Sequence, residues 1–142
     1  MKPNPFNDAA RAGLYLLPAA RQRHLRGQAA RAGLVLLTAE IGGCADVPAV
    51  LSKLGKDLDF PDWYGANLDA LHDCLTEPDW QQGKGIVLLI SGLESVHVKN
   101  PDNISTLIDV LRSAAETRSA EGLPFWILLT GNVVGIVALP AA

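Results

Sequence analysis

Cysteine and positive charge are both scarce in this sequence of 142 residues. The two cysteines, Cys44 and Cys74, cannot build a disulfide framework or a four-cysteine zinc site, and such low usage favours a reducing compartment. Lysine and arginine together number 12 against 15 aspartates and glutamates, which gives a net charge of -3. A general nucleic-acid binder normally carries a basic excess that displaces counterions from phosphates. We therefore expect no direct nucleic-acid partner, and the residues indicate no cofactor or metal.

Neither end of the chain has the pattern of a targeting segment. The first apolar stretch is interrupted by prolines and by Asp8 and Arg11, which argues against a secretory signal. Residues 122–142 carry no charge, but Pro124 and a Thr-Gly-Asn break interrupt them. A strand, a tight Gly-Asn hairpin turn and an extra edge strand or tail over 131–142 are expected there, with a membrane anchor as the alternative. The expected location is the cytoplasm, with no membrane partner.

The charges are unevenly distributed along the chain. Residues 1–33 hold six basic side chains and one acid, a net +5, whereas residues 34–142 hold six basic and 14 acidic side chains, a net -8. Between Asp57 and Asp79 there are seven acids and no lysine or arginine. Such a run favours a cationic partner, and the alternative is a solvated acidic face. The basic segment lacks interleaved aromatics, so it is more typical of a helix covering a sheet than of an RNA- or lipid-binding surface.

Continuous apolar runs alternate with helical patterns in the second part of the chain. Three such runs predict buried core strands at 34–40, 86–91 and 124–130. The helical patterns between them cover 46–58, 67–76 and 102–121. The resulting order, β-α-α-β-α-β, predicts an α/β fold in which helices pack around a small parallel sheet of three core strands.

No repeat or linker divides the chain, so one domain over 1–142 is expected. Its parts are an N-terminal strand-helix extension over 1–33, a core over 34–130 and the tail over 131–142. Within the extension, the pattern predicts a strand over 13–18 and a helix over 18–32. Residues 93–103, with the turn dipeptide Asn100-Pro101, are expected to be an irregular connection.

The predicted helix over 67–76 has two chemically distinct faces. Leu68, Leu71, Cys74 and Leu75 fall on one apolar stripe. On the outer face three acids follow each other at i, i+4 and i+8: Asp69, Asp73 and Glu77. Like charges at this spacing cost about 0.2 to 0.5 kcal/mol per pair, and no basic residue offsets them. A surface that tolerates this repulsion is suited to docking a positively charged partner.

Aromatic residues precede this helix, and a histidine lies on it. Trp63 and Tyr64 are residue types common at interfaces, with core packing as the equal alternative, and Gly65 is suited to a sharp turn. An enzyme would use Asp69, His72 and Asp73 as metal ligands or as an acid and base pair. These three residues share one exposed helix without a concave surround or an identifiable fourth group, so a binding role is favoured.

The tract FPDWYGANLDALHDCLT, residues 60–76, resembles the binding loop and helix of the barstar family, intracellular protein inhibitors of the secreted bacterial ribonuclease barnase. The order of a strand, a long helix and Ala120-Glu121-Gly122 before the last strand is also similar, so the resemblance covers about residues 34–130. It implies a barstar-like fold and inhibition without chemistry. The implied partner is a basic ribonuclease of the barnase type or a ribonuclease toxin to which this chain gives immunity.

The resemblance also implies roles for individual residues. Asp73 would take the position of an RNA phosphate in the nuclease active site, Asp69 would pair with a second cation, and Trp63 stands where the family has a tyrosine that packs on the catalytic histidine. The implied partner-binding set is Trp63, Tyr64, Gly65, Asn67, Leu68, Asp69, His72, Asp73, Thr76 and Glu77.

Several positions depart from the family. His72 replaces a tryptophan, Glu77 and Pro78 replace a glycine and an aromatic residue, and Trp80 is a candidate substitute for that aromatic. The family's acidic contact late in the last helix falls at Thr117, with Glu116 and Glu121 as uncertain substitutes. With these departures the target need not be barnase itself, and the alternative function is a barstar-like module for another basic protein.

Overall fold

A parallel sheet forms the centre of the molecule. The computed structural model describes residues 4–133 and 135–141, and within them the sheet has four strands in the order β1-β4-β3-β2. The strands are β1 (Leu14–Leu16), β2 (Val35–Glu40), β3 (Ile86–Ser91) and β4 (Phe125–Leu129). Leu88 of β3 pairs with Leu37 of β2 and with Ile127 of β4. The α/β class is confirmed, and the sheet has one strand more than the three predicted core strands because β1 pairs in parallel with β4.

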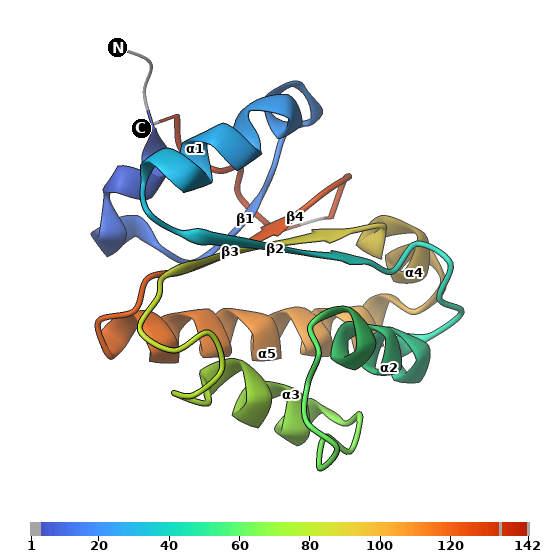
Figure 1. Cartoon of the computed structure of the whole chain (residues 1–142). Helices are drawn as coiled ribbons and strands as arrows, with labels where there is room; N and C mark the ends of the chain where they lie inside the picture. Colours follow the sequence, from blue (N-terminus) through green and yellow to red (C-terminus); the bar gives the residue numbers. More distant parts are fainter. Residues whose placement is uncertain (1–3, 134, 142) are drawn as a thin grey trace.

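Three helices cover one face of this sheet (Figure 1). They are α2 (Val47–Asp57), α3 (Leu68–Thr76) and α5 (Pro101–Ala120). Helix α5 lies between the strands and α3, and α3 packs on α5. Leu75 of α3, Leu107 of α5 and Leu88 of β3 are all fully buried in the larger apolar core. Strand β4 is buried along its whole length, which explains why its run of apolar residues is continuous rather than alternating.

The opposite face is covered by the residues that precede β2. Helix α1 (Leu25–Arg31) follows three 3-10 helices, at Pro5–Asn7, Ala9–Arg11 and Ala19–His24. The helix predicted over 18–32 is therefore 3-10 in its first half and α-helical in its second. Helix α1 lies on this side of the sheet (Figure 1). Phe6 and Leu25 from this layer form a second apolar cluster with Val87 of β3 and Trp126 of β4. The ring of Phe6 meets that of Trp126 edge to face at 5.1 Å.

The residues after β4 return to the free edge of β1. The amide of Leu16 donates to the carbonyl of Val137, and the amide of Leu139 donates to the carbonyl of Leu16, both at 2.8 Å. Arg21 donates to the carbonyls of Leu139 and Pro140. The bridge between Leu16 and Ala138 is parallel, so the Gly-Asn hairpin predicted after 124–130 was wrong. Strand β4 already has β1 and β3 on its two sides, which leaves no edge for a hairpin partner.

The segment predicted as irregular, 93–103, is helical. Helix α4 (Leu93–Lys99) begins after Gly92, whose φ is 92°, and α5 begins at Pro101. Helix α4 has only seven residues, with Leu93 and Val96 buried, so its periodic pattern is too short to be distinguished in the sequence. As for the uncharged end of the chain, no helix within 4–133 and 135–141 is long and apolar enough to cross a membrane.

Candidate partner-binding surface

The start of helix α3 is fixed by a side-chain cap. Asn67 has an extended backbone, and its Oδ1 accepts a hydrogen bond from the amide of Ala70 at 2.8 Å. This contact satisfies one of the amides that a helix leaves unpaired at its first turn. The preceding residue, Ala66, has a φ of 52° and makes the sharp turn that the sequence suggested for Gly65. At Gly65 the constraint is space, since a Cβ there would come within 3.0 Å of Asn67 Nδ2.

The two faces of α3 are separated as the sequence predicts. Leu71, Cys74 and Leu75 are buried, whereas Asp69 and Asp73 are exposed one turn apart. Neither carboxylate takes part in an ion pair in the described part of the chain, where the two ion pairs lie within α2 and within α5. Burial, followed by the charges of Asp73 and Glu77, raises the pKa of the Cys74 thiol, which disfavours its reactive thiolate. The apolar face of α3 is thus packed into the core, and its outer face presents unpaired negative charge to solvent.

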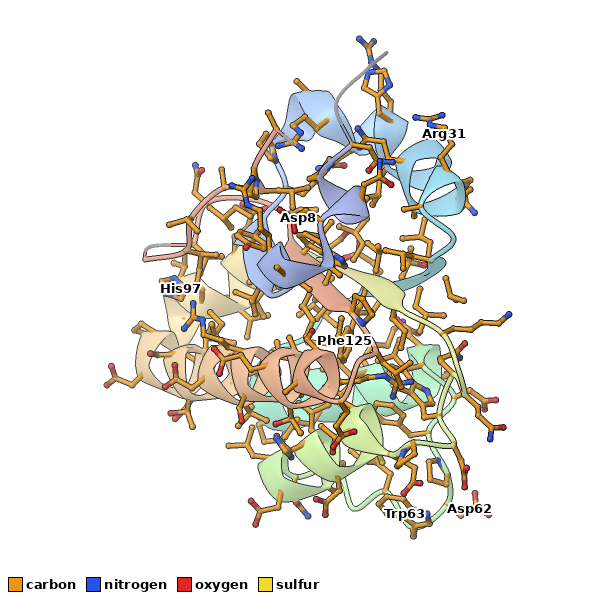
Figure 2. All side chains as sticks on the ribbon, turned by 90° about the vertical axis from the view of Figure 1, so that its left-hand side faces the viewer. Asp8, Arg31, Asp62, Trp63, His97 and Phe125 are labelled. Atoms are coloured by element: carbon orange, nitrogen blue, oxygen red, sulfur yellow. The ribbon has the colours of Figure 1, made fainter. Side chains whose placement is uncertain are left out.

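The aromatic residues of the loop before α3 divide between surface and core. Trp63 is 57% exposed and lies with Asp62 at the end of the molecule opposite Arg31 (Figure 2). Tyr64 points inward: its hydroxyl donates to the carbonyl of Leu51 at 2.8 Å, and its ring fills the space beside Gly55. Burial raises the pKa of Tyr64 to about 12. The structure therefore brings Trp63, rather than Tyr64, to the surface.

The second half of α3 is arranged against α5. His72 Nε2 lies 3.3 Å from the Ser113 hydroxyl, and Thr76 donates to the carbonyl of His72 at 2.8 Å. Glu77 lies beyond the helix in an extended conformation, and its Oε1 accepts from the amide of Asp79, so it does not continue the outer row of α3. Ser113 was missed by sequence reasoning because nothing in the pattern of α5 distinguishes it from other exposed serines.

Trp80 does not supply the aromatic surface that the sequence suggested for it. Its ring packs against Phe60 at 5.6 Å and Phe125 at 6.1 Å, and its indole N–H donates to the carbonyl of Leu58. Both candidate acidic substitutes are exposed, Glu116 on α5 and Glu121 just after its last residue, while Thr117 is partly buried. Pro78 stands where the family has an aromatic residue, and Trp80 does not restore an exposed ring on the surface beyond Thr76.

A cleft of about 690 Å³ opens beside the first half of α3. It is bounded by α2, α3 and α5, and its lining includes Leu51, Leu68, Asp69 and Thr106. Apolar side chains thus lie next to an unpaired carboxylate. Such a surface is complementary to a long basic side chain, whose stem is apolar and whose head is charged.

The carboxyl ends of the strands, where parallel sheets commonly bind ligands, are closed by the chain itself. Glu40 accepts from the amide of Gly42 at 2.8 Å, and Glu94 accepts from the amide of Asn132 at 3.2 Å. The backbones of Gly42 and Gly92 approach so closely that a Cβ on Gly92 would lie 2.4 Å from Gly42. Across 4–133 and 135–141, no group of three or more His, Cys, Asp or Glu side chains is placed to hold a metal ion.

Solved structures that resemble this fold come from larger proteins. The ORC2 protein of Aeropyrum pernix in its ADP form has a TM-score of 0.55 and 18% identity, over 89% of this chain and 37% of that chain. Its ADPNP-ADP complexes give a TM-score of 0.54 and 15% identity, over 87% and 36%. The Drosophila ORC bound to DNA gives 0.50 and 16%, over 89% and 34%. This chain spans about a third of the length of those chains, and at such identities the likeness concerns the fold alone.

The family comparison is more specific. No curated protein sequence matches this chain. A family model described as Barstar (barnase inhibitor) matches residues 34–130. The matched segment runs from the residue before β2 to the residue after β4, and it includes the loop before α3 and the whole of α3. Because this match covers more than half of the sequence, the chain belongs to the barstar family.

Proposed function

We propose that this chain inhibits a basic ribonuclease of the barnase type by covering its active site with α3 and the loop before it. The nuclease is either a secreted enzyme or the nuclease domain of a toxin to which the chain gives immunity. The observation that carries the proposal is the pair Asp69 and Asp73, which are exposed one turn apart and form no ion pair with any residue that the structure describes.

The chemistry of the two surfaces is complementary. A nuclease that binds RNA phosphates must present cations in its active site, and a carboxylate at Asp73 meets them as a phosphate would. Asp69 meets a second cation at the edge of the same site, and the exposed ring of Trp63 adds apolar contact area beside them. Thr76 and His72 lie on the adjoining part of α3, so they border the same contact.

Inhibition of this kind requires no reaction on the inhibitor. The proposed contact surface is a convex helix, and its groups are arranged to neutralise charge rather than to activate water or a nucleophile. We therefore propose that the chain is not an enzyme. Its place of action would be the cytoplasm, where a cell that makes the nuclease must protect its own RNA.

A titration tests the proposal. The purified chain is added to barnase and to a panel of related toxin nuclease domains, and hydrolysis of an RNA substrate is followed. We expect activity to fall linearly to zero at one inhibitor per enzyme, with an association rate that decreases steeply as salt rises. Pancreatic-type ribonuclease, which is also basic but unrelated in shape, serves as the control and should stay active. If no barnase-type nuclease is inhibited, the proposal is wrong.

A second candidate function is binding of another basic protein through the same carboxylates. It is favoured by the far end of α3, where His72, Glu77 and Pro78 depart from the family and the inward-facing Trp80 does not replace the lost aromatic. In that case all ribonucleases in the panel stay active, while a purified basic partner binds the parent chain and loses binding to Asp73→Ala.

A further inference from the structure

Arg118 lies in the last turn of α5, beneath the end of α3, and is 1% exposed. Its Nη1 donates to the carbonyls of Leu75 and Glu77 at 3.3 and 3.2 Å. Its Nη2 donates to the carbonyls of Trp80 and Gln81 at 2.6 and 3.1 Å. The guanidinium also lies 5.5 Å from the centre of the Trp80 ring. A single side chain of α5 thus holds four carbonyls at the end of α3 and in the loop that follows.

This burial is not explained by packing alone. Arg118 forms no ion pair in the described residues, and desolvation lowers the pKa of its guanidinium, although the charge of Glu121 acts in the opposite direction. A buried cation without a directly paired carboxylate is costly, so an apolar side chain of similar volume would fill the space with less penalty. What an apolar residue cannot supply is a set of donors for carbonyls at the end of α3 and in the loop that follows. At the C-terminus of a helix, the negative end of the helix dipole also favours a cation.

The held carbonyls set the direction of the chain at the end of the acidic helix. Gln81 has a φ of 53°, a conformation uncommon outside glycine, and its carbonyl is one of the four. The guanidinium is planar and rigid, so its donors fix the relative orientation of several acceptors at once. The last turn of α3, which starts at Asp73, therefore cannot rotate relative to α5 without breaking these hydrogen bonds.

We propose that Arg118 is a positioning residue for the partner-binding face of α3, because it locks the helix end and the following loop onto α5 and so fixes where Asp73, Thr76 and Glu77 point. Its effect on inhibition rests on the proposed function. Its effect on the position of α3 does not, and the two can be measured separately.

The first test is hydrogen exchange on the chain alone. In Arg118→Lys, which keeps the charge but loses the planar fork, we expect the Trp80 amide, which donates to the Glu77 carbonyl at 3.0 Å, to exchange at least tenfold faster than in the parent. The amide of Leu88 in the centre of β3 should change only as much as the global stability changes. Arg112→Lys, the same replacement six residues earlier on α5, is the control and should leave the exchange of Trp80 unchanged. If Trp80 exchanges in Arg118→Lys as in the parent, the positioning role is wrong.

The second test uses barnase as the probe, at a temperature where denaturation curves show each variant fully folded. Because Arg118→Lys keeps the charge, the association rate should stay within twofold, while the complex should dissociate at least tenfold faster. In Arg118→Ala, millimolar methylguanidinium should slow dissociation again and methylammonium should not. A variant that only lost stability would show none of these kinetic changes once folded.

The outcomes separate the two proposals. If the parent does not inhibit barnase, the proposed function fails for this nuclease, and the exchange rates alone decide the role of Arg118. If the parent inhibits and Arg118→Lys inhibits equally well, the function stands and the positioning role is overturned. Should Arg118→Ala fail to fold, the lysine variant still decides.

Discussion

The two faces of the sheet are covered by layers that differ in both charge and contacts. The upper layer consists of residues 4–33, which hold five arginines and one aspartate, and of the uncharged residues 135–141. Its apolar side chains cover β3 and β4. The lower layer, α2, α3 and α5, lies within the part of the chain that matches the barstar family and carries the unpaired carboxylates of Asp69 and Asp73. Arg31 and Trp63 mark the opposite ends of the molecule (Figure 2).

This difference separates stability from binding. Without the upper layer, the buried side chains of Val87, Trp126 and Leu128 would face water, so residues outside the family match complete the core. The exposed groups of α3 add little to the core and even repel each other. We propose that 1–142 unfolds as one unit, with changes in the upper layer altering stability and changes on the outer face of α3 altering inhibition.

The largest expected effect is at the contact between β4 and the upper layer. Trp126→Ala removes a ring that is fully buried and packed against Phe6, and we expect a loss of about 3 to 5 kcal/mol in the free energy of unfolding. Urea denaturation measures this loss, and the inhibition constant of the folded fraction should not change.

Trp126→Phe is the matched control. The indole N–H of Trp126 has no hydrogen-bond partner in the described residues, so phenylalanine loses area but no hydrogen bond and should cost clearly less than alanine. If Trp126→Ala costs less than about 1 kcal/mol, or if unfolding shows two separate transitions, the two layers do not form one cooperative core.

The next largest effect is on the outer face of α3. Asp73→Ala should weaken inhibition by about 2 kcal/mol or more, at least about thirtyfold in Kd, because a cationic pocket of the nuclease loses its anion. The free energy of unfolding should change by less than about 0.5 kcal/mol, since Asp73 is exposed and unpaired. Inhibition assays and urea denaturation measure the two quantities on the same sample.

Net charge alone must be excluded as the cause. Asp59→Asn removes one negative charge from the same acidic segment, at an exposed site whose φ of 54° asparagine tolerates. We expect only a small, salt-dependent decrease in association rate. An equal loss of inhibition in Asp59→Asn and Asp73→Ala would mean that the position of the carboxylate is irrelevant.

The sequence predicts much of the fold that underlies these two layers, but not all of it. Strands β3 and β4 follow from continuous apolar runs, because both faces of a central strand are buried. The run at 34–40 also forms a strand, but it was wrongly predicted to be buried, since β2 lies at the edge of the sheet and is mostly only partly buried. The helix over 67–76 and its buried stripe Leu71, Cys74 and Leu75 follow from helical periodicity, whereas the cap made by Asn67 was not predicted. The path of the tail does not, because the same apolar residues suit a hairpin or a strand on β1, and only the order of the sheet decides between them.

Charge and helical spacing predicted the exposed carboxylates of the candidate site, but they could not predict which aromatic side chains point inward. Charge and spacing placed Asp69 and Asp73 on the outer face, whereas the inward direction of Tyr64 and Trp80 depends on where Gly55 and Phe125 leave space. Arg118 could not be identified, since a basic residue in the last turn of a helix is ordinarily a solvated one. Its burial depends on the carbonyls of a loop distant in sequence.

Asn67 contributes to both stability and the proposed contact surface, so its replacement should have a moderate effect on stability and on inhibition. Asn67→Ala removes the cap of α3 and should cost about 1 kcal/mol in the free energy of unfolding. Inhibition should also weaken, because Asp69 lies in the first turn that the cap holds. Asn67→Asp, which keeps an acceptor at this position, should retain most of the stability. If stability falls but inhibition does not, the first turn of α3 lies outside the contact.

The smallest expected effect concerns Tyr64 at high pH. Its pKa is raised to about 12 by burial, above the ordinary value near 10. Between these two pH values the unfolded chain loses the tyrosine proton while the folded chain keeps it, so the contribution of Tyr64 to stability is complete below pH 10 and is lost as pH rises toward 12. In Tyr64→Phe this loss is absent, although the variant is less stable at neutral pH because the hydrogen bond to Leu51 is gone. Thermal unfolding of both proteins at pH 8, 10 and 11 should show that the difference in stability between them becomes smaller as pH rises, since other groups titrate alike in both. A difference that stays constant would mean that the Tyr64 hydroxyl ionises as freely in the folded protein as in the unfolded chain.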